Sequence, residues 1–252
     1  MSGAATKELV ANRTLRLLAA KRRSPGMGGA VDARCTGGQM LVDIGCSTGA
    51  FLGRMHDRYD ALVGIDFIPA TRSEFDNVQF LQADLRLGIP LAEAMADTVT
   101  ATEVIEHIAD PILLVREAFR IARPGAEFIL TTPNVRYIKH LFQLVVRGRG
   151  PKTAAHHDDE LLWDGGHIHY FTSSDLEALL KEAGFVGVRS LALIQPEGSL
   201  PLARAFLSRW PGNPVVREFL TGRLLVTGRK PEDAELASVA GSMGGTYEAI
   251  DQ

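Results

Sequence analysis

The sequence has few cysteines, few aromatic side chains and no long apolar run, and its charges nearly balance. With two cysteines, Cys35 and Cys46, among 252 residues, a disulfide framework is excluded, and we expect a reducing compartment, the cytoplasm. No apolar run approaches the length of a membrane span, and we expect no secretory leader. The formal charge of −3 excludes a global attraction to nucleic acid or membranes, so any such partner must use a local patch.

What is present is ordinary for a globular protein with one sizeable core: 46% of the residues are hydrophobic and 23% are charged. We expect an N-terminal helix and linker over residues 1–38, with the helix near Ala5–Arg23 and a flexible, glycine-rich connection over Ser24–Gly38. One catalytic domain should follow over residues 39–230. Residues 231–252 are small, polar and glycine-rich, which predicts a disordered tail.

Strand and helix patterns alternate along the catalytic domain, which predicts an α/β fold with a doubly wound parallel sheet. Seven strands are predicted, at residues 40–44, 61–66, 78–83, 97–102, 126–132, 186–194 and 222–229. The clearest helix is Pro111–Ala122, because Asp110 is a suitable N-cap and proline favours the first helical position. A second helix is predicted at Ser173–Ala183.

The most informative segment is an apolar strand that runs into a glycine-rich turn over residues 40–49. Gly45 lets the chain turn sharply off the strand, and Gly49, without a side chain, lets the next helix pack close to a ligand and to the sheet. A second apolar strand ends about twenty residues later in Asp66, where a ribose hydroxyl would need an acceptor. This arrangement predicts a site for an adenosine-containing cofactor.

Dinucleotide-binding dehydrogenases carry a similar turn, so the turn alone leaves two families open. Asp43 at the end of the first strand would repel a pyrophosphate, but it suits a ligand with an amino group and a sulfonium. A further carboxylate, Asp84, ends the third apolar run. Asp43 therefore favours S-adenosylmethionine over a dinucleotide.

Between Met40 and Gly187 the chain resembles the class I S-adenosylmethionine-dependent methyltransferases, of the small-molecule group that includes the ubiquinone-biosynthesis O-methyltransferases. The resemblance lies in the turn Asp-x-Gly-x-Ser-x-Gly at 43–49, where Ser47 replaces the usual middle glycine, and in the segments 101–107, 123–125, 131–134 and 166–172. It implies a seven-stranded Rossmann-like sheet whose last strand pair is antiparallel.

The same resemblance implies the cofactor-binding residues. Asp43, Gly45, Ser47 and Gly49 would line the methionine part, Asp66 would hold the ribose, Phe67 would pack near the adenine, Asp84 and Leu85 would bind the adenine edge, and Thr102 would also contact the cofactor. Each of three residues has a purely structural alternative. Asp66 would then be a strand-end cap, Asp84 a solvated turn carboxylate and Phe67 a core residue.

Transfer to a hydroxyl also requires removal of a proton, and His107 is the best-placed base. Glu103, Glu106 and His107 gather on one side if their segment is helical, and His167 could close over them from a later loop. Four such side chains suit a divalent cation such as Mg²⁺, and the small-RNA 3′-terminal 2′-O-methyltransferases carry a similar set. Alternatively, the pair of glutamates caps a helix or contacts the cofactor.

The region 134–170 is longer than a simple connection and rich in cations, so it is predicted to form a lid that selects a small-molecule methyl acceptor. The acceptor would be a quinone, sugar or natural-product hydroxyl. Two other hypotheses remain, a metal-dependent RNA 2′-O-methyltransferase and a non-catalytic cofactor-binding regulator. The acidic balance and the scarcity of aromatic residues argue against nucleic acid. The acceptor, the methylated atom and the oligomeric state are left open.

Overall fold

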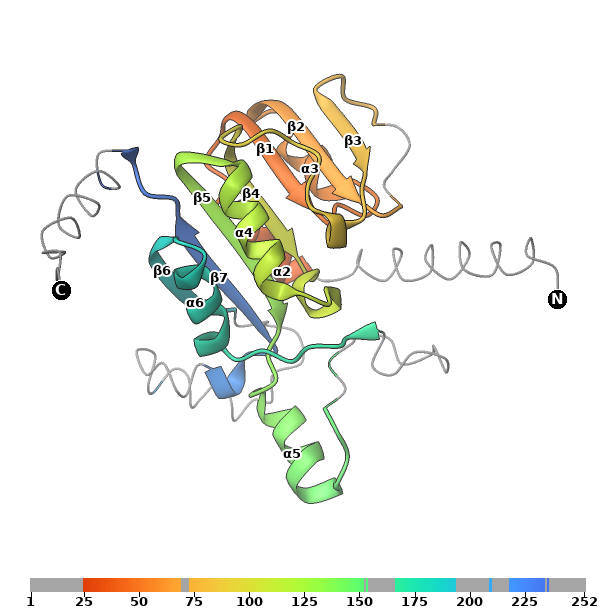
Figure 1. Ribbon diagram of the computed structural model, residues 1–252. Coiled ribbons are helices and arrows are strands. Elements are labelled where there is room, and N and C mark those ends of the chain that lie inside the picture. Colours follow the sequence, from red (N-terminus) through yellow and green to blue (C-terminus); the bar gives the residue numbers. More distant parts are fainter. Residues whose placement is uncertain are drawn as a thin grey trace, which may run out of the picture.

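The computed structural model describes residues 25–68, 73–151, 153, 166–193, 209, 218–233 and 235. Its centre is a seven-stranded sheet in the order β3-β2-β1-β4-β5-β7-β6 (Figure 1). The strands are β1 (Gly38–Ile44), β2 (Tyr59–Asp66), β3 (Val78–Gln82), β4 (Ala96–Thr102), β5 (Ala122–Pro133), β6 (Val186–Leu193) and β7 (Arg223–Arg229). The first five are parallel, and β7 is antiparallel to both of its neighbours. The predicted fold class and the antiparallel last pair are confirmed.

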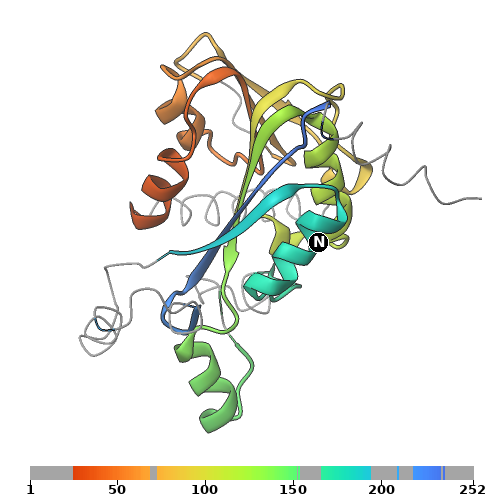
Figure 2. The same ribbon diagram turned by 90° about the vertical axis from the view of Figure 1, so that its left-hand side faces the viewer.

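Helices cover both faces of the sheet (Figures 1 and 2). On one face lie α2 (Pro25–Asp32) and α3 (Ala50–Met55), and on the other α4 (Pro111–Ile121) and α6 (Ser173–Glu182). A further helix, α5 (Ile138–Arg147), extends away from the sheet beyond the carboxyl end of β5. Within the described part of the chain, no helix is long and apolar enough to cross a membrane.

The ends of α4 follow from local chemistry. Asp110 accepts a hydrogen bond from the Leu113 backbone N–H at 3.2 Å, and Pro111 occupies the first turn, as predicted. At the other end the Lys230 ammonium donates to the carbonyls of Phe119 and Ala122, at 2.9 and 2.8 Å. These bonds satisfy carbonyl groups at the end of the helix. Burial lowers the pKa of Lys230.

The prediction of a flexible connection over residues 24–38 is wrong for its first part, because residues 25–32 form α2. Tertiary contacts outweigh the low helix propensity of its three glycines. Val31 is buried in the core, and Asp32 accepts a bidentate ion pair from Arg54 of α3, with Nε at 2.8 Å. The predicted helix at residues 5–23 lies outside the described residues, as does nearly all of the predicted tail.

The sheet fixes the place of the site. The chain passes from β1 to β2 and β3 on one side of β1 and then crosses back to β4 on its other side, so the strand order reverses between β1 and β4. In open α/β sheets such a reversal of strand order leaves a crevice at the carboxyl ends of the strands, where ligands bind. Apolar residues of β1 pack on both sides of the sheet and those of β4 on one side, so the carboxyl ends of these two strands are held in the core.

Candidate functional site

The turn after β1 is held in a left-handed conformation by close packing. Gly45 and Gly49 have φ angles of 75° and 73°. A Cβ atom on Gly45 would overlap the Val104 side chain, and one on Gly49 would overlap the ring of Phe80 on β3. The predicted close approach of Gly49 to the sheet is therefore present, and glycine is required at both positions.

Ser47 adopts the same left-handed region, with φ of 52°, where a side chain is disfavoured. Its N–H donates to Asp66 Oδ2 at 2.9 Å, and Asp66 Oδ1 accepts from the Ile68 N–H at 3.1 Å. Asp66 thus connects the turns after β1 and β2 and keeps further lone pairs for other donors. The Ser47 hydroxyl is buried and has no hydrogen-bond partner among the described residues. A buried hydroxyl of this kind suits a bound polar ligand.

Asp43 lies at the centre of this region and is 4% exposed. It pairs in register with Thr100 of β4, whose hydroxyl donates to Asp43 Oδ1 at 2.7 Å. A buried carboxylate is retained where a cation or donors face it. The sulfonium and amino groups of S-adenosylmethionine are such groups, so the residues around Asp43 fit this cofactor.

Asp84 and Phe67 complete the predicted cofactor edge. Asp84 follows β3 and forms a bidentate ion pair with Arg86, at 2.5 to 3.1 Å, which lowers the pKa of Asp84 to about 2. The carboxylate therefore stays charged at neutral pH. Phe67 is 61% exposed, so the alternative that it is a core residue is wrong. Leu85 begins the short 3₁₀ helix η2 (Leu85–Leu87) that Asp84 caps.

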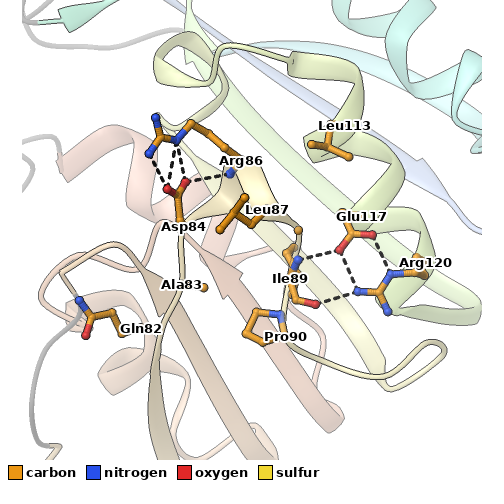
Figure 3. Close-up of a pocket in the computed structure, with 11 residues that line it drawn as sticks. Gln82, Ala83, Asp84, Arg86, Leu87, Ile89, Pro90, Leu113, Glu117 and Arg120 are labelled. Carbon is orange, nitrogen blue, oxygen red and sulfur yellow. Dashed lines mark hydrogen bonds and ion pairs between the residues drawn. The ribbon is translucent and has the colours of Figure 1, made fainter.

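A pocket of about 670 Å³ opens beside Asp84, between η2 and α4 (Figure 3). Its far wall is the ion pair of Glu117 and Arg120, with Arg120 Nε 2.7 Å from Glu117 Oε1. Glu117 accepts from the Ile89 N–H, and Arg120 donates to the Ile89 and Leu91 carbonyls. The sequence analysis did not identify this wall, because nothing in the local pattern links α4 to residues 89–91.

On the β4 side of the crevice the chain turns sharply at Glu103, with φ of 54°. The Glu103 carboxylate pairs with Arg223 of β7 at 2.8 Å and accepts from the Thr131 hydroxyl at 3.5 Å. The segment is not helical from residue 103, because the 3₁₀ helix η3 covers only Ile105–His107. Glu103 therefore lies outside the group formed by the other three predicted metal ligands.

Glu106, His107 and His167 do come together, each with one potential ligand atom within 4.8 Å of the others. Glu106 is 1% exposed, accepts from the Thr132 hydroxyl at 3.0 Å, and lies 3.9 Å from His167 Nε2. The imidazole rings of His107 and His167 lie edge to face, with their centroids 4.7 Å apart. Three side chains of types that can bind a metal thus form one small group beside the carboxyl end of β4.

Two backbone hydrogen bonds hold the loop of residues 166–169 against the group of Glu106, His107 and His167. The Ile168 and His169 N–H groups donate to the Glu106 carbonyl, at 2.9 and 3.2 Å. His107 Nδ1 lies 3.1 Å from the Gly166 carbonyl, which can only accept, so Nδ1 carries the proton of that bond. The neutral His107 ring then has its lone pair on Nε2, where it can take a proton or bind a metal.

A family model described as a methyltransferase domain matches residues 4–190. The chain belongs to this methyltransferase family. The predicted resemblance to methyltransferases of the S-adenosylmethionine-dependent class is confirmed at the level of the family. The matched range includes the turn after β1, Asp66, Asp84, η3 and the loop that carries His167.

Curated relatives match the methyltransferase domain over part of its length. One is a probable S-adenosylmethionine-dependent methyltransferase from Mycolicibacterium smegmatis, 34% identical over 105 residues, which are 40% of each chain. Another is a ubiquinone biosynthesis O-methyltransferase from Psychrobacter arcticus, 29% identical over 163 residues, which are 59% of each chain. The chain spans about 40 to 64% of the length of these and the similar relatives.

Solved structures share the fold of this methyltransferase domain. A Haloferax volcanii methyltransferase in complex with the Trm112 activator has a TM-score of 0.61 and 19% identity, over 87% of this chain and 94% of its own. A phosphoethanolamine N-methyltransferase from Haemonchus contortus has a TM-score of 0.57 and 14% identity, over 82% of this chain and 53% of its own. At these identities the likeness concerns the fold alone.

Proposed function

We propose that this chain transfers a methyl group from S-adenosylmethionine to a hydroxyl oxygen of a small-molecule acceptor. The observation that carries the proposal is His107, which lies at the carboxyl end of β4 and is oriented by the Gly166 carbonyl. Its Nε2 lone pair is the base that an acceptor hydroxyl requires. The named ubiquinone biosynthesis O-methyltransferases among the relatives support an oxygen acceptor.

Residues on the two sides of the crevice would have different roles. Asp43, Ser47 and Asp66 would hold the cofactor, which when bound supplies an electrophilic methyl group on a sulfonium. His107 Nε2 would accept the hydroxyl proton as the acceptor oxygen forms its bond to that methyl carbon and the carbon–sulfur bond breaks. S-Adenosylhomocysteine and the methyl ether are the products. Positioning of the acceptor and exclusion of water would supply much of the rate.

Calorimetry with S-adenosylmethionine and S-adenosylhomocysteine tests the cofactor first. Asp66→Ala should weaken binding by about 1 to 3 kcal/mol, because a hydrogen-bonded carboxylate is lost. Asp60→Ala is the matched control, since Asp60 is exposed on the same strand, and it should bind normally. Thermal unfolding without cofactor separates a loosened turn from a lost contact. Failure of the wild type to bind either compound would refute the proposal.

An acceptor screen tests the base. With an accepted hydroxyl compound, His107→Ala should lower kcat by about 100-fold and leave cofactor affinity unchanged. His107 is exposed, so the variant is expected to fold. Cofactor binding without any acceptor would favour the non-catalytic regulator, and turnover of RNA but no small molecule would favour the 2′-O-methyltransferase.

As an alternative role for His107, we propose a divalent cation at Glu106, His107 and His167, because these residues bring one carboxylate oxygen and two imidazole nitrogens together. Nε2 of His107 cannot serve as base and metal ligand at once, so the two proposals make different predictions. Calorimetry with Mg²⁺, Mn²⁺ and Zn²⁺ should show binding that His167→Ala removes. Glu103→Gln is the control, since Glu103 pairs with Arg223 outside the group. Absence of binding for all three ions would leave His107 as a base.

A further inference from the structure

The helix α5 exposes apolar side chains although the sheet nearby has a well-packed core. Five of the eleven large exposed hydrophobic residues in the described part of the chain lie on α5: Ile138, Phe142, Leu144, Val145 and Val146. Val145 is 80% exposed and Val146 64%, and none of the residues of α5 is buried. Contiguous exposed apolar side chains of this kind mark an interaction surface.

The spacing of these residues makes α5 amphipathic. Ile138, Phe142 and Val145 recur at i, i+4 and i+7 and therefore share one face. Lys139, Gln143 and Arg147 recur at i, i+4 and i+8 on the other. A helix with an apolar face in water and cations beside it is typical of helices that lie in the plane of a membrane interface.

The charge of the segment is opposite to that of the whole chain. Residues 135–151 contain four cations, Arg136, Lys139, Arg147 and Arg149, and no acidic residue, whereas the chain has a formal charge of −3. Arg136 pairs with Glu218 at 2.6 Å, and the other three cations lie on α5 or directly after it. Because the whole chain has no net positive charge, an anionic partner must bind a local cluster of cations, and these residues form such a cluster. Clusters of cations on an amphipathic helix are attracted to anionic lipids.

The position of α5 makes its face accessible. The helix follows β5 at the carboxyl edge of the sheet and extends away from the sheet in both views (Figures 1 and 2). Gly148, with φ of 58°, ends the helix and turns the chain before Arg149. A flat surface could therefore meet α5 without displacing α4 or α6.

We propose that α5 docks on an anionic lipid bilayer. Its apolar face inserts among the lipid headgroups, and Lys139, Arg147 and Arg149 contact the lipid phosphates. The carboxyl edge of the sheet, where His107 lies, then faces the bilayer. The docking rests on the surface of α5 and does not depend on the reaction proposed above.

Co-sedimentation of the full chain with phosphatidylglycerol–phosphatidylcholine vesicles tests the apolar face. The double variant Val145→Asp/Val146→Asp should weaken binding by about tenfold or more, because two apolar side chains no longer insert. Met95→Asp is the matched control, since Met95 is 38% exposed and lies in the turn that leads into β4, remote from α5. Its binding should equal that of the wild type.

Charge reversal tests the cations. Arg147→Glu/Arg149→Glu should weaken binding by about twentyfold or more, at about fivefold for each cation lost. Arg116→Glu/Lys181→Glu makes the same change in net charge on α4 and α6, at two residues whose side chains are each 60% exposed, and should change binding little. Wild-type binding should also fall with salt and be much weaker on pure phosphatidylcholine vesicles.

Three results would overturn the proposal. The first is no binding of the wild type to anionic vesicles, or equal binding to neutral ones. The second is a dimer in sedimentation velocity that Val145→Asp/Val146→Asp dissociates without any vesicle binding, which would assign the face to a second copy of the chain. The third is a marked fall in thermal stability of that variant, again without vesicle binding, which would assign the face to another segment of the same chain.

Discussion

Two buried carboxylates at the centre of the molecule have the same kind of partner but are held by different kinds of structure. Asp43 accepts from the Thr100 hydroxyl at 2.7 Å, and Glu106 accepts from the Thr132 hydroxyl at 3.0 Å. Asp43 lies within β1, in register with β4, and the glycine-rich turn of residues 45–49 begins two positions later. Glu106 lies in a single 3₁₀ turn whose shape depends on residues from β5, β7 and the loop 166–169.

The two carboxylates thus illustrate two ways in which the backbone of a site can be held in place. On the side of the crevice proposed for the cofactor, formed by residues 43–49 and 66, the backbone conformation is set locally, by positive φ angles at Gly45, Ser47 and Gly49. On the side proposed for the acceptor, around residues 103–107, it is set by side chains from distant parts of the chain, such as Arg223 on Glu103 and Glu218 on Arg136. The locally determined turn should be destabilised by substitutions that add side-chain atoms. The region held by long-range contacts should be destabilised by substitutions that remove a polar partner.

Gly49→Ala should give the largest effect, because it fills space in the rigid turn. The new Cβ would overlap the Phe80 ring and force an alanine to adopt a φ of 73°. Overpacking and left-handed strain together should lower the free energy of unfolding by about 3 to 5 kcal/mol. Urea denaturation measures the change. Gly53→Ala, in α3 with ordinary contacts around its Cβ, is the control and should be neutral or slightly stabilising. Equal stability of both variants would contradict a space-limited turn.

Arg223→Met should give the next largest effect, on the acceptor side. It leaves the Glu103 carboxylate, whose side chain is 11% exposed, without its cation. Loss of one partner of a largely buried ion pair should lower the free energy of unfolding by about 2 to 3 kcal/mol. The double variant Glu103→Gln/Arg223→Met should recover most of the loss, since no charge then remains buried. If the double variant is as unstable as the single one, packing rather than charge explains Arg223.

This contrast also determines what could be predicted from the sequence. The seven strands, the N-cap at Asp110 and the turn after β1 are coded by contiguous residues and were predicted correctly. The antiparallel last pair was predicted from the family resemblance and is confirmed. The pairs Glu103–Arg223 and Asn134–Glu218 join residues more than 80 positions apart, so no local pattern could indicate them. A helical spacing placed Glu103 with Glu106 and His107, but the positive φ at Glu103 breaks that spacing.

Local propensity was likewise a poor guide where tertiary contacts dominate. The glycine-rich residues 25–32 were predicted to be irregular, yet they form α2, which the Asp32–Arg54 ion pair joins to α3. The assignment of Asp43, Ser47 and Asp66 to the cofactor, and of His107 to catalysis, stays a prediction.

Matched threonine variants compare the two carboxylates directly. Thr100→Val and Thr132→Val each remove one hydroxyl donor from a buried carboxylate, so each should cost about 1 to 3 kcal/mol of stability. Their functional effects should differ. Thr100→Val should weaken S-adenosylmethionine binding in calorimetry, whereas Thr132→Val should leave that affinity intact and lower turnover. Equal losses of cofactor affinity would show that the two sides of the crevice act as one unit.

The smallest expected change in stability concerns Cys35, which is buried in the core just before β1. Burial, and next the negative charge of Asp43, raises the pKa of Cys35 from 9.0 to about 12. At pH 8 the native thiolate should then be about a thousandfold scarcer than in the unfolded chain, so iodoacetamide should label Cys35 only through unfolding. Because the folded pKa is the higher one, this thiol favours the folded state below pH 9 and destabilises it progressively as the pH rises from 9 towards 12. Peptide-resolved mass spectrometry measures the labelling. Rapid native labelling of Cys35 would mean that the packing around β1 is looser than described and would remove the contrast with the acceptor side.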